Sequence, residues 1–100
     1  MAMTATSAGN KLKTAYQNAG GVTALPWATI IELLLSLFGD CTTAQAQQVA
    51  KKHPLAVELM FGNKLLTDMP SLKPKDRRLI AGLAVKEFAK AKASDIDGMR

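Results

Sequence analysis

The chain has very little of the chemistry that most enzymes need. Among its 100 residues there is one cysteine, Cys41, and one histidine, His53. A single cysteine cannot form a disulfide within the chain, and one thiol with one imidazole cannot supply the three or four ligands of a zinc site. No nucleophile stands at a motif spacing from a base, and no glycine-rich phosphate-binding motif occurs. We therefore predict a protein that is not an enzyme, with no catalytic residues, no metal and no cofactor.

Aromatic residues are also scarce, at 5% of the chain. Strands favour aromatic and β-branched side chains, whereas the apolar residues here are largely leucine, alanine and methionine, which favour helices. No alternating strand pattern is present, and no hairpin turn separates apolar runs. A hydrophobic content of 48% argues against disorder throughout. The composition predicts one all-α domain.

Prolines and glycines divide this domain into segments. Pro26, Pro54 and Pro74 each suit the first turn of a helix, and Gly20 and Gly39 suit positions just after one. We expect a small bundle of four main helices at about 26–38, 44–52, 54–66 and 74–93, with a short N-terminal helix at about 11–19. The ends, 1–9 and 94–100, are predicted to be flexible tails around a helical domain at 10–93.

Two of these helices have a predicted inner face. On the helix at 54–66, the residues expected to face inward are Leu55, Leu59, Phe61 and Leu66.

The helix at 26–38 is the most apolar and carries one charge, Glu32. The window from Gly20 to Gly39 has the length of a bilayer crossing, but a carboxylate near its centre removes most of the gain from insertion.

Polar residues on this apolar helix favour a soluble central helix. Thr29, Glu32 and Ser36 recur at i, i+3 and i+7 and so form one stripe, which predicts a water-facing edge. The remaining face is larger than its neighbours can easily cover, so we expect a homo-oligomer. The predicted oligomer interface consists of Trp27, Ile30, Ile31, Leu34, Leu35 and Phe38. Association with a membrane remains a further alternative.

Positive charge is concentrated near the C-terminus. Residues 73–92 hold seven basic and two acidic side chains, which equals the whole net charge of +5. At 100° per residue, one sector of this helix contains Lys75, Arg78, Lys86, Lys90 and Lys92. Gly82 lies in the same sector, so a phosphate or a backbone could approach closely. The pattern favours an anionic partner, either an acidic protein surface or nucleic acid, although no aromatic residues are interleaved for base stacking.

The two isolated reactive residues have simple interpretations. His53 precedes Pro54 and suits a capping or surface position, and Cys41 suits a small buried hydrophobe, with a reactive thiol as the alternative. The N-terminus lacks the apolar run of a signal peptide, so we expect a cytoplasmic or otherwise intracellular protein. Our hypothesis is a small non-enzymatic protein that self-associates through its apolar helix and presents its basic helix to an anionic partner. Nucleic-acid binding by the basic helix is the alternative.

Overall fold

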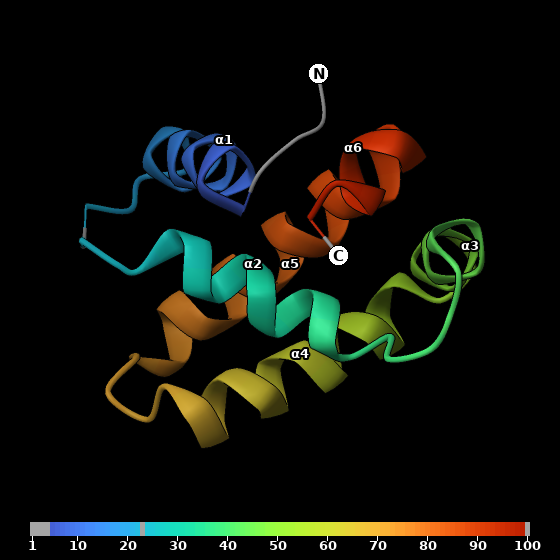
Figure 1. Ribbon diagram of the computed structural model, residues 1–100. Helices are drawn as coiled ribbons and strands as arrows, with labels where there is room; N and C mark the ends of the chain where they lie inside the picture. The colour runs from blue at the N-terminus through green and yellow to red at the C-terminus, as the bar shows by residue number, and fades with distance from the viewer. Residues whose placement is uncertain (1–4, 23, 100) are drawn as a thin grey trace.

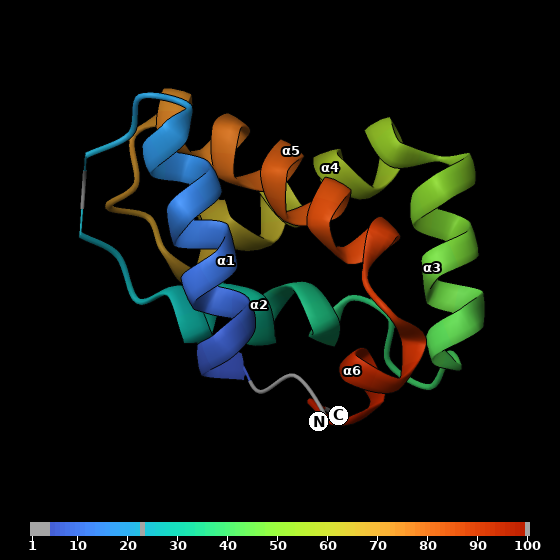
Figure 2. The same ribbon diagram turned by 90° about the horizontal axis from the view of Figure 1, so that it is seen from above.

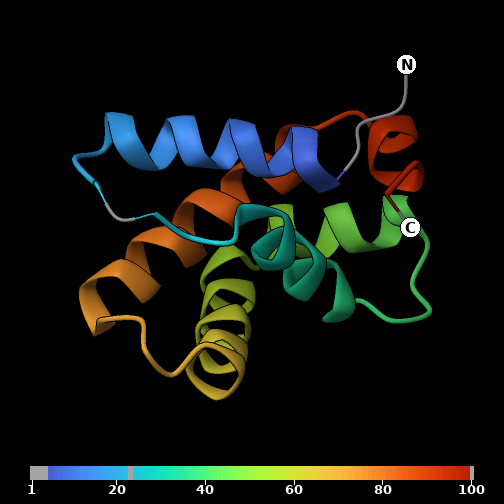
Figure 3. The ribbon, with the colours of Figure 1, turned by 60° about the vertical axis from the view of Figure 1, so that its left-hand side comes forward.

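The computed structural model describes residues 5–22 and 24–99, and this part of the chain forms six helices and no strand (Figure 1). The helices are α1 (Ala5–Asn18), α2 (Trp27–Ser36), α3 (Thr43–Lys52), α4 (Pro54–Asp68), α5 (Pro74–Lys90) and α6 (Ala93–Asp97). The predicted all-α class is therefore confirmed. The helices point in different directions, with α4 running across α1 (Figure 3).

The core is built around α5, which contacts α1, α2, α3 and α4 (Figure 2). Its inner face carries Ile80, Ala84 and Phe88, all buried. The hydroxyl of Tyr16 on α1 donates a hydrogen bond of 2.7 Å to Oδ1 of Asp76, in the first turn of α5. This bond ties α1 to the beginning of the central helix.

Both ends of the chain are more ordered than the sequence predicts. α1 begins at Ala5, and Gly9 lies in its crossing with α2, where an added Cβ would come within 2.9 Å of the backbone of Trp27 and Ala28. At the other end, α6 buries Ile96 in the core. The predicted flexible tails are therefore wrong for residues 5–9 and 94–97, because each contains a residue that packs against the domain. Residues 1–4 and 100 lie outside the described part of the chain.

The inner face of α4 is not the predicted one. The structure buries Val57, Phe61 and Leu65, whereas the other three residues predicted to face inward are exposed. Those exposed residues are Leu55, Leu59 and Leu66. The helix has two apolar stripes on opposite sides, and the local pattern cannot tell which of them meets the rest of the chain. Only packing against α2, α3 and α5 decides it.

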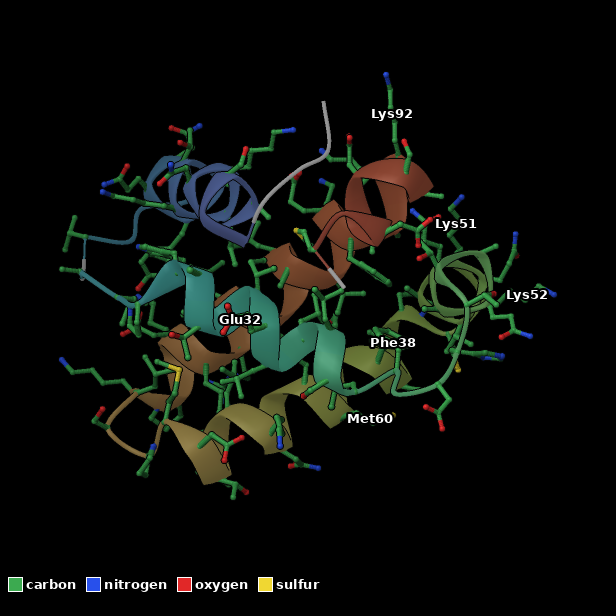
Figure 4. The ribbon with its side chains drawn as sticks, viewed as in Figure 1. Glu32, Phe38, Lys51, Lys52, Met60 and Lys92 are labelled. Carbon is green, nitrogen blue, oxygen red and sulfur yellow. The ribbon has the colours of Figure 1, made fainter. Side chains whose placement is uncertain are left out.

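The polar stripe of α2 lies where the sequence predicts. Thr29, Glu32 and Ser36 are all exposed, which confirms the water-facing edge of this helix. Glu32 is labelled on the side of α2 that faces the viewer in Figure 4. Among the described residues, no helix combines the length and the apolar content that crossing a bilayer requires.

Candidate interaction surfaces

The predicted oligomer interface on α2 is mostly occupied by the protein's own chain. Four of its residues are at most 8% exposed, namely Trp27, Ile30, Ile31 and Leu34. The Trp27 ring packs against Tyr16 of α1, with ring centroids 5.2 Å apart. Within one chain, α1, α4 and α5 already cover this face of α2, so these four positions leave little apolar surface for a second copy.

The other two residues predicted for that interface, Leu35 and Phe38, are half-buried. Phe38 stacks on Phe88 of α5 with ring centroids 4.9 Å apart, so part of its surface is also used within the chain. What these two residues leave exposed is a minor share of the apolar surface. The larger share lies on α4.

The exposed stripe of α4 consists of Leu55, Leu59, Gly62 and Leu66, and we call it the α4 ridge. Its three leucines are 73%, 71% and 50% exposed. Gly62 is open to solvent to the extent that an added Cβ would meet nothing within 4 Å. Met60, which is 52% exposed, adds apolar surface beside the ridge. In Figure 1, α4 runs along the lower edge of the molecule, and no other described helix lies beyond it.

The α4 ridge has a sequence signal of its own. Its members recur at i, i+4, i+7 and i+11, which is the spacing of one helical face. A helix on the surface of a soluble domain typically has one apolar stripe, which faces the core, whereas α4 has a second one on its exposed side. Since residues 5–22 and 24–99 cover only the face with Phe61, the ridge is an unpartnered helix face in this part of the chain.

All five cations that the sequence singles out are exposed. The five are Lys75, Arg78, Lys86, Lys90 and Lys92. An added Cβ on Gly82 would lie 3.9 Å from the carboxyl group of Glu58 on α4. Gly82 therefore keeps ordinary van der Waals room, with an acidic group beside the middle of the basic sector.

The end of α5 gains cations from α3. Nε2 of Gln47 donates hydrogen bonds to the backbone carbonyls of Phe88 (3.3 Å) and Ala91 (2.7 Å), so α3 is fixed against the last turn of α5. Lys51 follows Gln47 by one helical turn. The exposed cations of this region are Lys51, Lys52, Lys90 and Lys92, and we call them the basic cluster.

The basic cluster is partly neutralised by a local acid. Lys90 forms an ion pair with Glu87 at 3.0 Å on the same helix. Figure 4 shows the labelled lysines of α3 and Lys92 along one side of the molecule. Lys51 and Lys52 were not predicted to belong to this surface, because the packing of α3 against α5 depends on the Gln47 contacts rather than on any local pattern.

The isolated thiol and imidazole are held apart. Cys41 is exposed, so its interpretation as a buried hydrophobe is wrong. His53 is exposed between α3 and α4, and its backbone amide donates to the carbonyl of Val49 at 2.8 Å. The ten residues of α3 separate the two side chains by about 15 Å along the helix. Within the described residues, no three His, Cys, Asp or Glu side chains are grouped so that they could hold a metal ion.

Comparison with known proteins finds no matching family model, no similar curated protein and no similar solved structure. The functional argument therefore depends on the surfaces themselves. The two most distinctive are the α4 ridge and the basic cluster.

Proposed function

We propose that this protein is a small non-enzymatic interaction protein that self-associates through the α4 ridge and presents the basic cluster to an anionic partner. The observation that carries the proposal is that α4 has leucines on its exposed face as well as apolar residues on its buried face. Water-exposed leucines in a row on one helix are typical of a surface that another protein covers. This moves the self-association predicted for α2 to a different helix.

The chemistry of the ridge favours a second copy of the same chain as its partner. The ridge carries no charge, so it offers nothing that would select an acidic or a basic partner. It is also nearly symmetric along its length, because Leu59 and Leu66 lie on either side of Gly62. In an antiparallel pair, Leu59 of each copy would pack on Leu66 of the other, as a two-fold interface requires. Gly62 would allow the two helices to approach closely near the axis.

Disulfide trapping tests this arrangement directly. Cys41 is replaced by serine, and a single cysteine is introduced at Asn63 or at Thr67, which are both exposed. In the antiparallel pair, the two copies of residue 63 lie next to the axis, whereas the two copies of residue 67 are about 14 Å apart along the helices. Since a disulfide requires Cα atoms within about 7 Å, Asn63→Cys should form a covalent dimer on mild oxidation.

The control and the contradicting results follow from the same geometry. Thr67→Cys should form no covalent dimer under the same conditions. Equal crosslinking of the two variants would mean random collision, and crosslinking of Thr67→Cys alone would contradict the antiparallel register. If neither variant forms a covalent dimer at protein concentrations up to the solubility limit, self-association through α4 is rejected.

The basic cluster supports the second half of the proposal. Its lysines come from the end of α3, from the last residue of α5 and from the N-cap of α6, and Gln47 fixes α3 against the last turn of α5. The partner is an acidic protein surface or the phosphate backbone of nucleic acid, and both interactions weaken with salt. Contact with about four phosphates predicts a log–log salt slope of about −3 to −4.

Fluorescence anisotropy with a labelled DNA duplex and a labelled poly-glutamate peptide distinguishes the two partners. Charge reversal at Lys51 and Lys92 should weaken binding of the true partner, irrespective of DNA sequence if that partner is DNA. The matched control is charge reversal at Lys75 and Arg78, which lie at the other end of α5. If the control pair weakens binding as much as the cluster pair, then net charge alone is responsible and the cluster is not a site.

A further inference from the structure

A cavity of about 300 Å³ lies between α1, α2, α5 and α6. Its walls are mainly apolar, and the largest wall residues are Ile31, Leu34, Leu35, Phe88, Ile96 and Met99. Small-molecule pockets begin at about this volume and have walls of this kind. At about 30 Å³ for each water-sized group, the space holds roughly ten non-hydrogen atoms.

The mouth of the cavity is charged. Lys11 comes from α1, Lys90 ends α5, and Lys92 is the N-cap of α6. The acids are Glu87 and Asp95. Glu87 is already paired with Lys90 at 3.0 Å. Neither Lys11 nor Lys92 forms an ion pair with any residue that the structure describes, so the mouth keeps an excess of positive charge.

A shallow polar groove against α1 adjoins the cavity and shares Lys11 and Glu87 with it. Asn10 and Thr14 also line this groove. The complete site therefore has an apolar interior, a polar entrance and a cationic rim. This is the arrangement that an amphipathic anion requires, because its apolar part leaves water while its charge stays at the surface.

We propose that this cavity binds a small amphipathic carboxylic acid, with its hydrocarbon part against Ile31 and Ile96 and its carboxylate near Lys11 and Lys92. The volume matches an acid such as octanoate, which has ten non-hydrogen atoms. A ligand of this size in an open-mouthed site binds with a dissociation constant on the order of 0.1 to 1 mM. The inference does not depend on self-association, because the α4 ridge takes no part in the cavity.

The four isoleucines of the chain provide an internal test by methyl NMR. Ile31 and Ile96 line the cavity, whereas Ile30 and Ile80 are fully buried elsewhere in the core. Titration with octanoate should shift the methyl signals of Ile31 and Ile96 to saturation and leave those of Ile30 and Ile80 nearly unchanged. Octan-1-ol should bind more weakly, and octyltrimethylammonium more weakly still.

Charge reversal provides the matched variants. Lys11→Glu with Lys92→Glu should weaken octanoate binding by about three- to tenfold. Lys13→Glu with Lys86→Glu makes the same change in net charge at exposed positions that do not line the cavity, and should leave binding unchanged. Absence of a shift at Ile31 and Ile96, at several times the expected dissociation constant, would overturn the proposal. Equal affinity for octan-1-ol and octanoate would also overturn it. So would shifts of the Ile31 and Ile96 signals that appear on raising the protein concentration alone, because they would mean that a second copy fills the cavity.

Discussion

Replacing Leu59 by glutamine should weaken self-association without weakening the fold. Leu59 is 71% exposed in the folded chain. Complete burial of a leucine side chain is worth about 1.5–3 kcal/mol, so covering the exposed part contributes about 1–2 kcal/mol in each protomer. The substitution removes this contribution from both protomers, which is about 2–4 kcal/mol per dimer and a 30- to 1,000-fold weaker dimer.

The strength of the wild-type dimer sets the concentrations that the assay needs. Full covering of the ridge leucines and Met60 would contribute about 7 to 15 kcal/mol per dimer. Association itself costs about 4 to 15 kcal/mol. A contribution of about 11 kcal/mol and a cost of about 4 to 7 kcal/mol give a dissociation constant in the micromolar to millimolar range, which is the range we expect. Sedimentation equilibrium over the range from about 10 μM to 1 mM covers this interval.

The control for this experiment is Val22→Gln. Val22 lies between α1 and α2 and is 93% exposed, so it is more exposed than Leu59 but does not belong to the ridge. Neither substitution should change the free energy of unfolding of the monomer by more than about 0.5 kcal/mol. A Leu59→Gln dimer that dissociates within threefold of the wild type, or a wild-type protein that remains monomeric at about 1 mM, would refute the reasoning.

Two further substitutions test the fold, each against a neighbouring residue of the same type. Leu65→Ala should lower the free energy of unfolding by about 2–5 kcal/mol because Leu65 is fully buried, whereas Leu66→Ala should lower it much less because that side chain is 50% exposed. Urea denaturation at low protein concentration measures both, and a larger loss for Leu66→Ala than for Leu65→Ala would mean that α4 is turned the other way. Gln47→Glu places a carboxylate against two backbone carbonyls and should cost at least about 2 kcal/mol at pH 7. Since the folded state raises the pKa of the introduced carboxyl above its unfolded value of about 4.3, this loss should diminish as the pH falls toward 4. The exposed Gln48→Glu should show neither effect.

The sequence predicts α2, α3, α4 and α5 to within about three residues because their boundaries depend on local chemistry, whereas it misses the start of α1 and the whole of α6. Pro54 and Pro74 each begin a helix as expected, and Thr42 forms a reciprocal capping box with Gln45 before α3. The exposed edge of α2 was also predictable, because three polar residues on one apolar helix have only one favourable orientation. In each case the information lies within a few residues along the chain.

The candidate surfaces were harder to predict because they depend on which helices meet. The apolar excess of α2 was recognised, but the chain itself covers it through α1, which begins at Ala5 rather than near Lys11. That longer helix supplies Ala8 and Leu12 to the core. The exposed apolar surface instead lies on α4, where two stripes compete. Likewise, Gln47 brings Lys51 to the end of α5 by a contact that no local spacing reveals.

The position of the two surfaces gives a consequence that links self-association to partner binding. In Figure 1, α4 runs along the lower edge of the molecule, whereas Figure 4 shows Lys51, Lys52 and Lys92 toward another side, so we expect that the same chain can use both surfaces at once. A two-fold dimer would then carry two basic clusters and bind a long anionic polymer at two places. Leu59→Gln, which removes no charge, should lower the affinity for a DNA duplex or acidic polypeptide long enough to span both clusters. The substitution should leave unchanged the affinity for a fragment that reaches only one cluster. If Leu59→Gln weakened the binding of long and short partners equally, the ridge would act on partner binding in some way other than pairing two protomers.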